Sequence, residues 1–217
     1  MIDNTKPTSG DDTTNFFYLP FLKHMDLTSP VDEQARKLIA HHCKLVKFGK
    51  GEPILTTGNV CKFVYFILSG ECISYYTDVS GKTKTWFFHF NQSESNIKNL
   101  FAVDYNSFIS GKPSGISIIA LSAVTAIRFS VNDVGVLKQG SRSIERWLHL
   151  LNEQAYIQTQ QRLTTLLTLS ALERYEKLLA TEPHLLNMFS NHLVATYLNI
   201  APQSLSRIRK KIASGII

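Results

Sequence analysis

The chain has 217 residues, of which 44% are hydrophobic and 11% aromatic, so it can bury a substantial core and is not disordered as a whole. Its 23 lysines and arginines exceed its 17 aspartates and glutamates by six, which favours an anionic partner without identifying one. No apolar run approaches the ~20 residues of a membrane-spanning helix. We also expect no signal peptide, because the sequence stays polar through Thr14.

The chain begins with a polar segment and then an amphipathic one. Residues 1–15 are rich in Thr, Asp and Asn without apolar periodicity, and we expect them to form a disordered lead-in. Within residues 30–43, Val31, Ala35 and Ile39 recur at helical spacing. This spacing predicts a helix with one apolar face.

From residue 45 the hydrophobic period changes to two, which is the period of a β-strand. The predicted strands are 45–48, 53–55, 63–68, 71–76, 84–90, 116–121 and 124–130. Turn-forming pairs such as Ser69-Gly70 and Ser80-Gly81 separate them. Many short strands at this spacing predict a barrel or roll, which we place at residues 16–130 as a double-stranded β-helix (jelly-roll) domain.

Residues 131–161 predict a long helix that connects this roll to the rest of the chain. Gly135 and Gly140 weaken its beginning, so the firm part starts near Ser143. About 30 residues would span ~45 Å, more than the roll needs for cover. One apolar seam consists of Ile144, Leu148, Leu151 and Ala155. A second copy of the chain is the simplest partner for such a seam, although the helix packing on its own roll remains an alternative.

The last part of the chain, residues 162–217, contains only helical patterns, so the fold class is α+β. A helix is predicted over 164–181, and Pro183 breaks the pattern after it. Ser190 or Asn191 is then a good N-cap for a short helix that ends near Leu198.

Residues 195–202 have the composition of a tight turn between two helices. Ala195 is small where two helices must approach closely, and Asn199 tolerates the left-handed backbone conformation of such a turn. Pro202 suits the first turn of the next helix, because its missing N–H would have no helical partner there. This arrangement predicts a helix-turn-helix unit.

The final helix separates apolar from polar residues. Leu205, Ile208 and Ile212 share the face that would pack inward. The candidate DNA-binding residues are Gln203, Ser204, Ser206, Arg207, Lys210 and Lys211. Gln and Arg can make paired hydrogen bonds to base edges, whereas Ser and Lys suit phosphate oxygens. A solvated cationic helix end that complements its own dipole is the alternative. The preceding helix and turn favour DNA binding.

In this order, a β-roll, a connecting helix and a C-terminal helix-turn-helix resemble the Crp/Fnr family of bacterial transcription regulators. Residues 48–55, Gly58 and residues 64–71 resemble the opening hairpins of the family. Glu173-Arg174-Tyr175, Pro183 and residues 205–211 further resemble a Bacteroidetes-type branch. Arg207 matches the DNA-contacting arginine of the family, and Gln203 and Ser204 match its neighbours.

The resemblance implies a sequence-specific regulator that binds double-stranded DNA as a homodimer paired through the long helix. Its two helix-turn-helix units would then enter successive major grooves ~34 Å apart. The resemblance also implies RNA polymerase as a further partner and a cytoplasmic location. We expect no β-hairpin wing, which many relatives append after the recognition helix.

The effector segment departs from the family pattern. Members that bind cyclic nucleotides carry a Gly-Glu pair for the ribose and an Arg-Ser pair for the cyclic phosphate. This chain has Val103-Asp104 and Ser114-Gly115 at those places, so Asp104, Ser114 and Gly115 are the candidate effector pocket. Without the arginine, nothing there cancels the phosphate charge. We therefore expect no cyclic AMP, and an unknown or absent effector; a cyclic-nucleotide response through a non-standard pocket remains an alternative.

Other cofactors lack a matching set of ligands. Cys43, Cys61 and Cys72 have no cluster spacing and no CxxC pair, so we expect reduced, buried thiols in a cytoplasmic protein rather than an iron–sulfur cluster. The isolated histidines that could ligate haem are His24, His89 and His149. We interpret each of them as a packed or exposed side chain and expect neither a metal nor a cofactor.

A cupin-like enzyme is the rival interpretation of the roll. Its metal site would need two histidines at close spacing on one strand, and the strand region offers His89 alone. We therefore expect no catalysis. On the same strand Trp86, Phe88 and Phe90 share one face, which we interpret as core plus contact surface.

Overall fold

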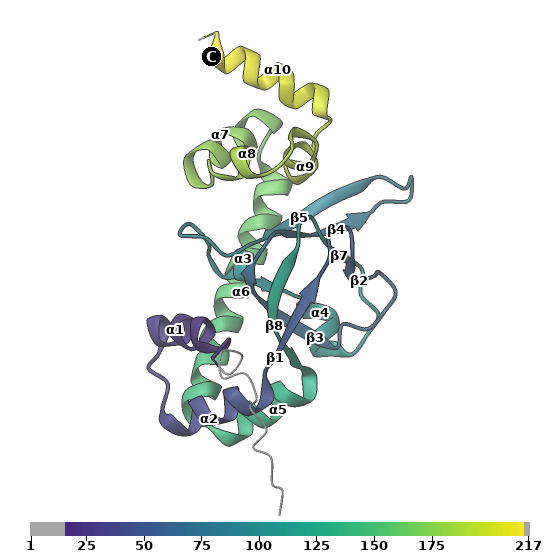
Figure 1. Ribbon diagram of the computed structural model, residues 1–217. Coiled ribbons are helices and arrows are strands. Elements are labelled where there is room, and N and C mark those ends of the chain that lie inside the picture. The colour runs from purple at the N-terminus through teal and green to yellow at the C-terminus, as the bar shows by residue number, and fades with distance from the viewer. Residues whose placement is uncertain (1–15, 215–217) are drawn as a thin grey trace, which may run out of the picture.

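The computed structural model describes residues 16–214, so the predicted lead-in 1–15 lies outside them. A β-roll occupies the middle of the molecule, with short helices at one end and a further group of helices at the other (Figure 1). The strands are β1 (Lys44–Phe48), β2 (Pro53–Leu55), β3 (Phe63–Ser69), β4 (Cys72–Thr77), β5 (Thr83–His89), β6 (Phe101–Ala102), β7 (Ser117–Ala120) and β8 (Val124–Ser130). The helices are α1 (Leu19–Thr28), α2 (Glu33–His42), α3 (Ile97–Leu100), α4 (Tyr105–Ser110), α5 (Val131–Gly140), α6 (Arg142–Thr168), α7 (Ala171–Thr181), α8 (Leu185–Met188), α9 (Asn191–Tyr197) and α10 (Pro202–Ala213).

The roll consists of two antiparallel sheets with strand orders β1-β8-β3-β6 and β2-β7-β4-β5. All seven predicted strands are present. The sequence did not indicate β6, α3 or α4, because elements of two to six residues are too short to show a period. The structure confirms the predicted α+β jelly-roll architecture followed by a helical part.

Gly70 makes the tight turn between β3 and β4. Its φ is +83°, and a Cβ at this position would lie 2.2 Å from the carbonyl oxygen of Ala123. A side chain is therefore excluded both by the backbone conformation and by the neighbouring chain. The position fixes how the first sheet passes into the second.

Alternate residues of β3 face different layers. Tyr65 and Ile67 are buried between the two sheets, while Phe66 points out of the roll into a second core formed with the helices. In that second core Phe66 contacts Phe21 of α1 edge to face, with ring centroids 5.2 Å apart. One sheet is thus covered on its outer side by α1, α2 and α6, which explains why β3 is apolar throughout.

The long helix begins later and ends later than expected. Ser141 is extended, with φ −152°, and its side chain accepts a hydrogen bond from Ile144 N, so it ends α5 and caps α6. The predicted single helix over 131–161 is therefore two helices, and α6 continues to Thr168. The helix predicted over 164–181 begins only at Ala171, because Ser170 forms a capping box with Glu173.

The predicted apolar seam of this helix faces mainly inward. Ile144 and Leu151 are buried together with Trp147 in the core shared with α1, and Leu148 and Ala155 are half-buried. Ile144 and Leu151 therefore pack on their own protomer, as the alternative interpretation held, and are not free to contact a second copy. The apolar residues of α6 that solvent does reach are Tyr156, Ile157, Leu163 and Leu167.

Candidate nucleic-acid interface

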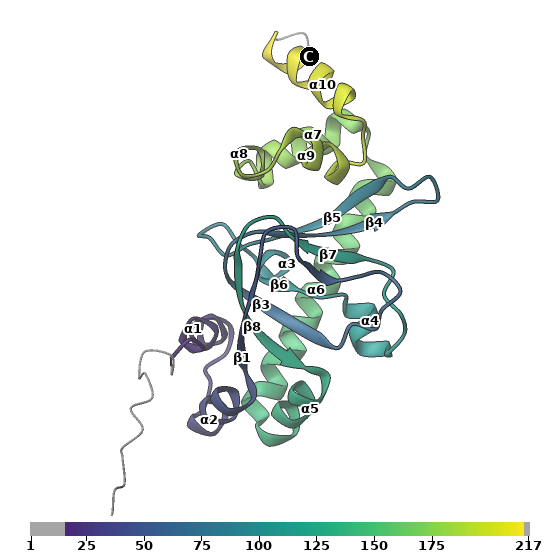
Figure 2. The ribbon, with the colours of Figure 1, turned by 45° about the vertical axis from the view of Figure 1, so that its right-hand side comes forward.

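The helices α9 and α10 lie at the end of the molecule farthest from α1 and α2 (Figures 1 and 2). Helix α9 begins after Ser190, whose side chain accepts a hydrogen bond from Leu193 N, as predicted for an N-cap. Val194 and Ala195 are completely buried in the core of this helical part. The small side chain of Ala195 therefore lies where the helices approach closely.

The turn between α9 and α10 depends on one residue. Asn199 has φ +53° and is the only non-glycine residue with positive φ in the described range 16–214. The next amide, Ile200 N, donates to Ala195 O at 3.0 Å, which closes the end of α9. Pro202 then occupies the first turn of α10, as predicted. These residues set the direction in which α10 leaves α9.

One face of α10 packs against the rest of the helical part. Leu205 is 1% exposed, and Ile208 and Ile212 are half-buried against the same core. Arg209 is also drawn inward, because its Nη1 donates to Asn191 Oδ1 at 2.6 Å. The guanidinium of Arg209 lies 5.8 Å from the centre of the Tyr175 ring. Arg209 thus holds α10 against α9 and α7 rather than pointing outward.

The opposite side of α10 is what we call the outer face: Gln203, Ser206, Arg207, Lys210 and Lys211. All five are exposed. At 3.6 residues per turn, Gln203, Arg207 and Lys210 form one stripe. Ser204 is half-buried at its edge, and Ser206 Oγ donates within the helix to Pro202 O at 3.2 Å. The structure thus brings five of the six predicted DNA-binding residues to one exposed surface.

The outer face is cationic, and no described residue supplies it with a counter-charge. Among the described residues, no carboxylate lies within 4 Å of Arg207, Lys210 or Lys211. From Pro183 to Ile217 the sequence contains four cations and no acid, so the other 182 residues hold 23 − 4 = 19 cations and 17 anions. Most of the excess charge therefore lies on the last helix, where it suits an anionic polymer.

The helical part is fixed to the roll through an aromatic contact. Phe88 of β5 stacks on Phe189 with ring centroids 4.1 Å apart and also contacts Tyr197 at 5.1 Å. Beside them, Thr85 and Thr196 share a buried hydrogen bond of 2.7 Å. This confirms that the aromatic face of residues 84–90 is core plus contact surface. The roll and the helix-turn-helix share one hydrophobic cluster.

Two of the three candidate effector residues, Asp104 and Ser114, come together as a buried pair, and Gly115 beside them is exposed. Ser114 Oγ lies 2.6 Å from Asp104 Oδ2, and the other oxygen of Asp104 accepts a hydrogen bond from Ser107 N at the start of α4. Ser114 Oγ also accepts from Ile116 N at 3.1 Å. Gly115 follows Ser114 in the chain. A Cβ added at Gly115 would lie 3.8 Å from a ring carbon of Tyr76, which is ordinary contact distance. The carboxylate of Asp104 and the hydroxyl of Ser114 therefore satisfy each other.

The isolated histidines and cysteines are separate from one another. His89 is fully buried, with Nδ1 3.0 Å from Lys98 O and Nε2 3.0 Å from Ser74 Oγ, so neither nitrogen is free for a metal. Burial lowers the pKa of His89 to about 4 and raises the pKa of Cys43 to about 11. Within residues 16–214, no group of three His, Cys, Asp or Glu side chains could hold a metal ion.

The fold is shared with solved structures of low sequence identity. FixK2 from Bradyrhizobium japonicum matches with a TM-score of 0.66 and 15% identity, over 81% of this chain and 86% of that chain. The c-di-GMP responsive global regulator CLP of Xanthomonas campestris matches with 0.63 and 14%, over 85% and 93%. A protein assigned to the crp/fnr family of transcriptional regulators from Eubacterium rectale matches with 0.62 and 13%, over 85% of both chains.

No protein-family model matches the chain, and no curated protein matches it. At such low identity the solved structures show the fold alone, which is that of Crp/Fnr regulators. Two of the three are named as regulators and none as an enzyme. None of the helices in the described part of the chain is both long and apolar enough to cross a membrane.

Proposed function

We propose that this chain is a sequence-specific DNA-binding transcription regulator of the Crp/Fnr type that acts as a homodimer. The observation that carries the proposal is the outer face of α10. Its exposed Gln203 and Arg207 can each form paired hydrogen bonds with base edges in a major groove. Lys210 and Lys211 lie one turn further along and suit phosphate oxygens.

The second copy is expected to pair along the later part of α6. Tyr156, Leu163 and Leu167 are 66%, 42% and 75% exposed. They are 7 and 4 residues apart, so they form one stripe along the helix. A coiled-coil contact along such a stripe would bury these side chains. This stripe replaces the inward-facing Ile144 and Leu151 as the proposed dimer surface.

The roll is proposed to act without cyclic AMP. A cyclic phosphate needs donors with positive charge, whereas the place of the family's arginine holds Ser114, whose hydroxyl is used by Asp104. A different effector, or none, fits this arrangement better. Thermal unfolding with cyclic AMP or cyclic GMP should show no shift in Tm. A clear shift would favour a cyclic-nucleotide-responsive regulator with a non-standard pocket.

Selection of preferred sites from random duplexes tests the proposed function directly. We expect a palindrome with half-sites ~34 Å apart, because a twofold dimer places two recognition helices in successive major grooves. Equal affinity for every selected and unselected duplex would contradict sequence-specific regulation. A single half-site would contradict the dimer.

Substitution Arg207→Ala should weaken binding to the preferred site by about 1–3 kcal/mol and relax base preference at one position. Lys211→Ala is the matched comparison on the same helix. It should weaken all duplexes alike and reduce the slope of affinity against salt by about one ion. Titrations of both variants on selected and scrambled duplexes separate base reading from phosphate contact.

A further inference from the structure

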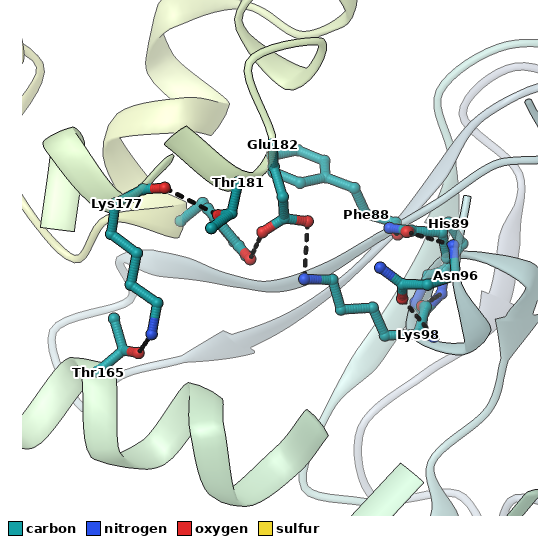
Figure 3. A network of polar contacts seen from close by, with 10 residues as sticks. Phe88, His89, Asn96, Lys98, Thr165, Lys177, Thr181 and Glu182 are labelled. Carbon is teal, nitrogen blue, oxygen red and sulfur yellow. Dashed lines mark hydrogen bonds and ion pairs between the residues drawn. The ribbon is translucent and has the colours of Figure 1, made fainter. Parts of the chain in front are cut away.

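A cleft of about 240 Å³ lies between the roll and the helical part, where α3, α6 and α7 meet. Figure 3 shows Lys98 of α3, Thr165 of α6 and Lys177 of α7, which all line this cleft. Helices α7 and α8 lie between this region and α10 in both ribbon views (Figures 1 and 2). The cleft is therefore separate from the outer face of α10.

The carboxylate in this cleft is already used. Glu182 pairs with Lys98 Nζ at 2.7 Å, and both side chains are only 13% exposed. The same carboxylate accepts a hydrogen bond from Tyr197 Oη at 3.2 Å. Glu182 is the one acidic side chain among the described residues that line the cleft. The ion pair with Lys98, drawn in Figure 3, balances its charge.

Three further cations line the cleft, and none of them forms an ion pair with a described residue. Arg162, Arg174 and Lys177 have no carboxylate within 4 Å among the residues that the structure describes. Their positions are held by neutral acceptors instead. Arg174 Nη1 donates to Leu166 O at 3.2 Å, and Lys177 Nζ donates to Thr165 Oγ1 at 2.8 Å. These bonds orient the cations without reducing the local charge of +3.

Arg162 is the deepest of the three, with 7% exposure. Its Nη2 donates to Tyr197 O, and its guanidinium carbon lies 3.7 Å from the centre of the Tyr197 ring. Its Nε and the Nε of Arg174 are both buried, and neither has a hydrogen-bond partner among the residues that the structure describes. Burial lowers the pKa of Arg162. The nearby Tyr197 and Glu182 raise it in part, whereas the like charge of Arg174 lowers it further. Buried cations of this kind are costly unless an anion accompanies them.

We propose that this cleft binds a small multivalent anion of the phosphate class, held by Arg162, Arg174 and Lys177. Guanidinium groups match phosphate oxygens in paired hydrogen bonds, and the side chains of Arg162, Arg174 and Lys177 all line the cleft. The cleft is smaller than the ~300–1,000 Å³ pockets of drug-sized ligands. Inorganic phosphate, pyrophosphate or the phosphate group of a small metabolite suits it better than a dinucleotide. The bound anion connects α6, which runs along the roll, with α7 of the helical part.

Isothermal titration of the full chain with inorganic phosphate, pyrophosphate and ribose 5-phosphate tests the proposal. Sodium chloride at equal ionic strength serves as the control for screening. We expect one saturable site per protomer, with the tightest of the three probes identifying the source of the phosphate. At about 100 times the dissociation constant, that probe should raise Tm by about 5–10 °C. Absence of saturable binding by all three probes at millimolar concentration overturns the proposal.

Variants locate the site. Arg174→Gln and Lys177→Gln should each weaken binding of the best probe at least tenfold. Lys177 is exposed, so its substitution leaves the core intact even if Arg174→Gln unfolds the chain. Lys211→Gln on the outer face of α10 is the matched control and should bind the probe like wild type. Binding that survives Arg174→Gln and Lys177→Gln but is lost in Lys211→Gln overturns the proposal, because it places the anion on α10.

Discussion

The interior of the roll and the outer face of α10 both carry titratable side chains, but Asp104 and His89 in the roll have hydrogen-bond partners, whereas no described carboxylate pairs with the cations of α10. Asp104 and Ser114 bind each other, and His89 has an acceptor or donor at each ring nitrogen. Arg207 and Lys211 contact no carboxylate among the described residues. The cost of burying a polar group explains the pairing in the roll. Solvent removes that cost on α10.

This difference separates stability from binding. Removing a paired group inside the roll leaves its partner unsatisfied and should lower the free energy of unfolding. Removing a solvated cation from α10 should change stability within ±0.5 kcal/mol and act on DNA affinity alone. The comparison would be wrong if substitutions in the roll left the free energy of unfolding unchanged, or if substitutions of the α10 cations lowered it.

The largest expected effect inside the roll is the pH response of His89. Its pKa in the folded chain is about 4, against an ordinary value of 6.5, because of its burial. At pH 7 the imidazole is neutral in both states. As pH falls from 6.5 to 4, the unfolded chain takes up a proton that the folded chain refuses, so unfolding is favoured by up to about 3 kcal/mol. Below about pH 4 both states bind the proton, so this loss of stability is complete and no longer changes with pH.

Urea unfolding of wild type and His89→Asn at pH 7 and at pH 4 measures this contribution. Wild type should lose about 3 kcal/mol more than the variant between the two pH values. The variant is expected to be less stable at pH 7, since His89 bonds to Ser74 and Lys98. That loss does not affect the test, because the quantity compared is the change in unfolding free energy of each protein between pH 7 and pH 4. Equal changes in both proteins would contradict a buried neutral His89.

A smaller effect is expected from Ser114→Ala. The substitution removes a hydroxyl 2.6 Å from the buried carboxylate of Asp104 and should cost about 1–3 kcal/mol of unfolding free energy. Ser110→Ala is the matched control, because Ser110 Oγ donates to Asn106 O and accepts from Lys112 N at exposed positions, where water can replace both bonds. Chemical denaturation at pH 7 compares the two. A loss as large for Ser110→Ala would show that burial of the pair is not what matters.

The smallest expected effect concerns the orientation of α10. Asn199 has φ +53°, a conformation that alanine adopts at a cost of about 1 kcal/mol and glycine adopts freely. Asn199→Ala should therefore lower Tm by about 2–4 °C, while Asn199→Gly should match wild type. Thermal unfolding of both variants checks this. If glycine destabilised as much as alanine, the side chain rather than the backbone would determine the turn.

The helix-turn-helix and the long helix differed in how far the sequence predicted them. Ser190, Asn199 and Pro202 each act through their own backbone or cap, so their types alone indicated the turn. The seam of α6 depended on which neighbour it meets. Ile144 and Leu151 have the spacing of a dimer seam, but Phe21 of α1 and the outer side of the roll cover them first. Periodicity shows that a face is buried and leaves open what buries it.

The effector segment and the anion cleft required the tertiary structure for the same reason. In the sequence, Asp104 and Ser114 stand ten residues apart, at the places of the family's ribose-binding and phosphate-binding pairs. Only the fold shows that their side chains bind each other. Arg162, Arg174 and Lys98 lie on three elements, so no local pattern connects them. Arg209 gave the opposite result: it belongs to the cationic run, yet its bond to Asn191 draws it away from the outer face.

The sequence by itself determined the strands of the roll, the caps and turn of the helix-turn-helix and the local excess of cations after Pro183. These features depend on periodicity, single-residue backbone preference and composition, which act over a few residues. The tertiary structure alone decided which charges are paired and which apolar stripe stays exposed. Pairing and burial depend on residues brought together from distant parts of the chain, such as Glu182 with Lys98 and Phe189 with Phe88.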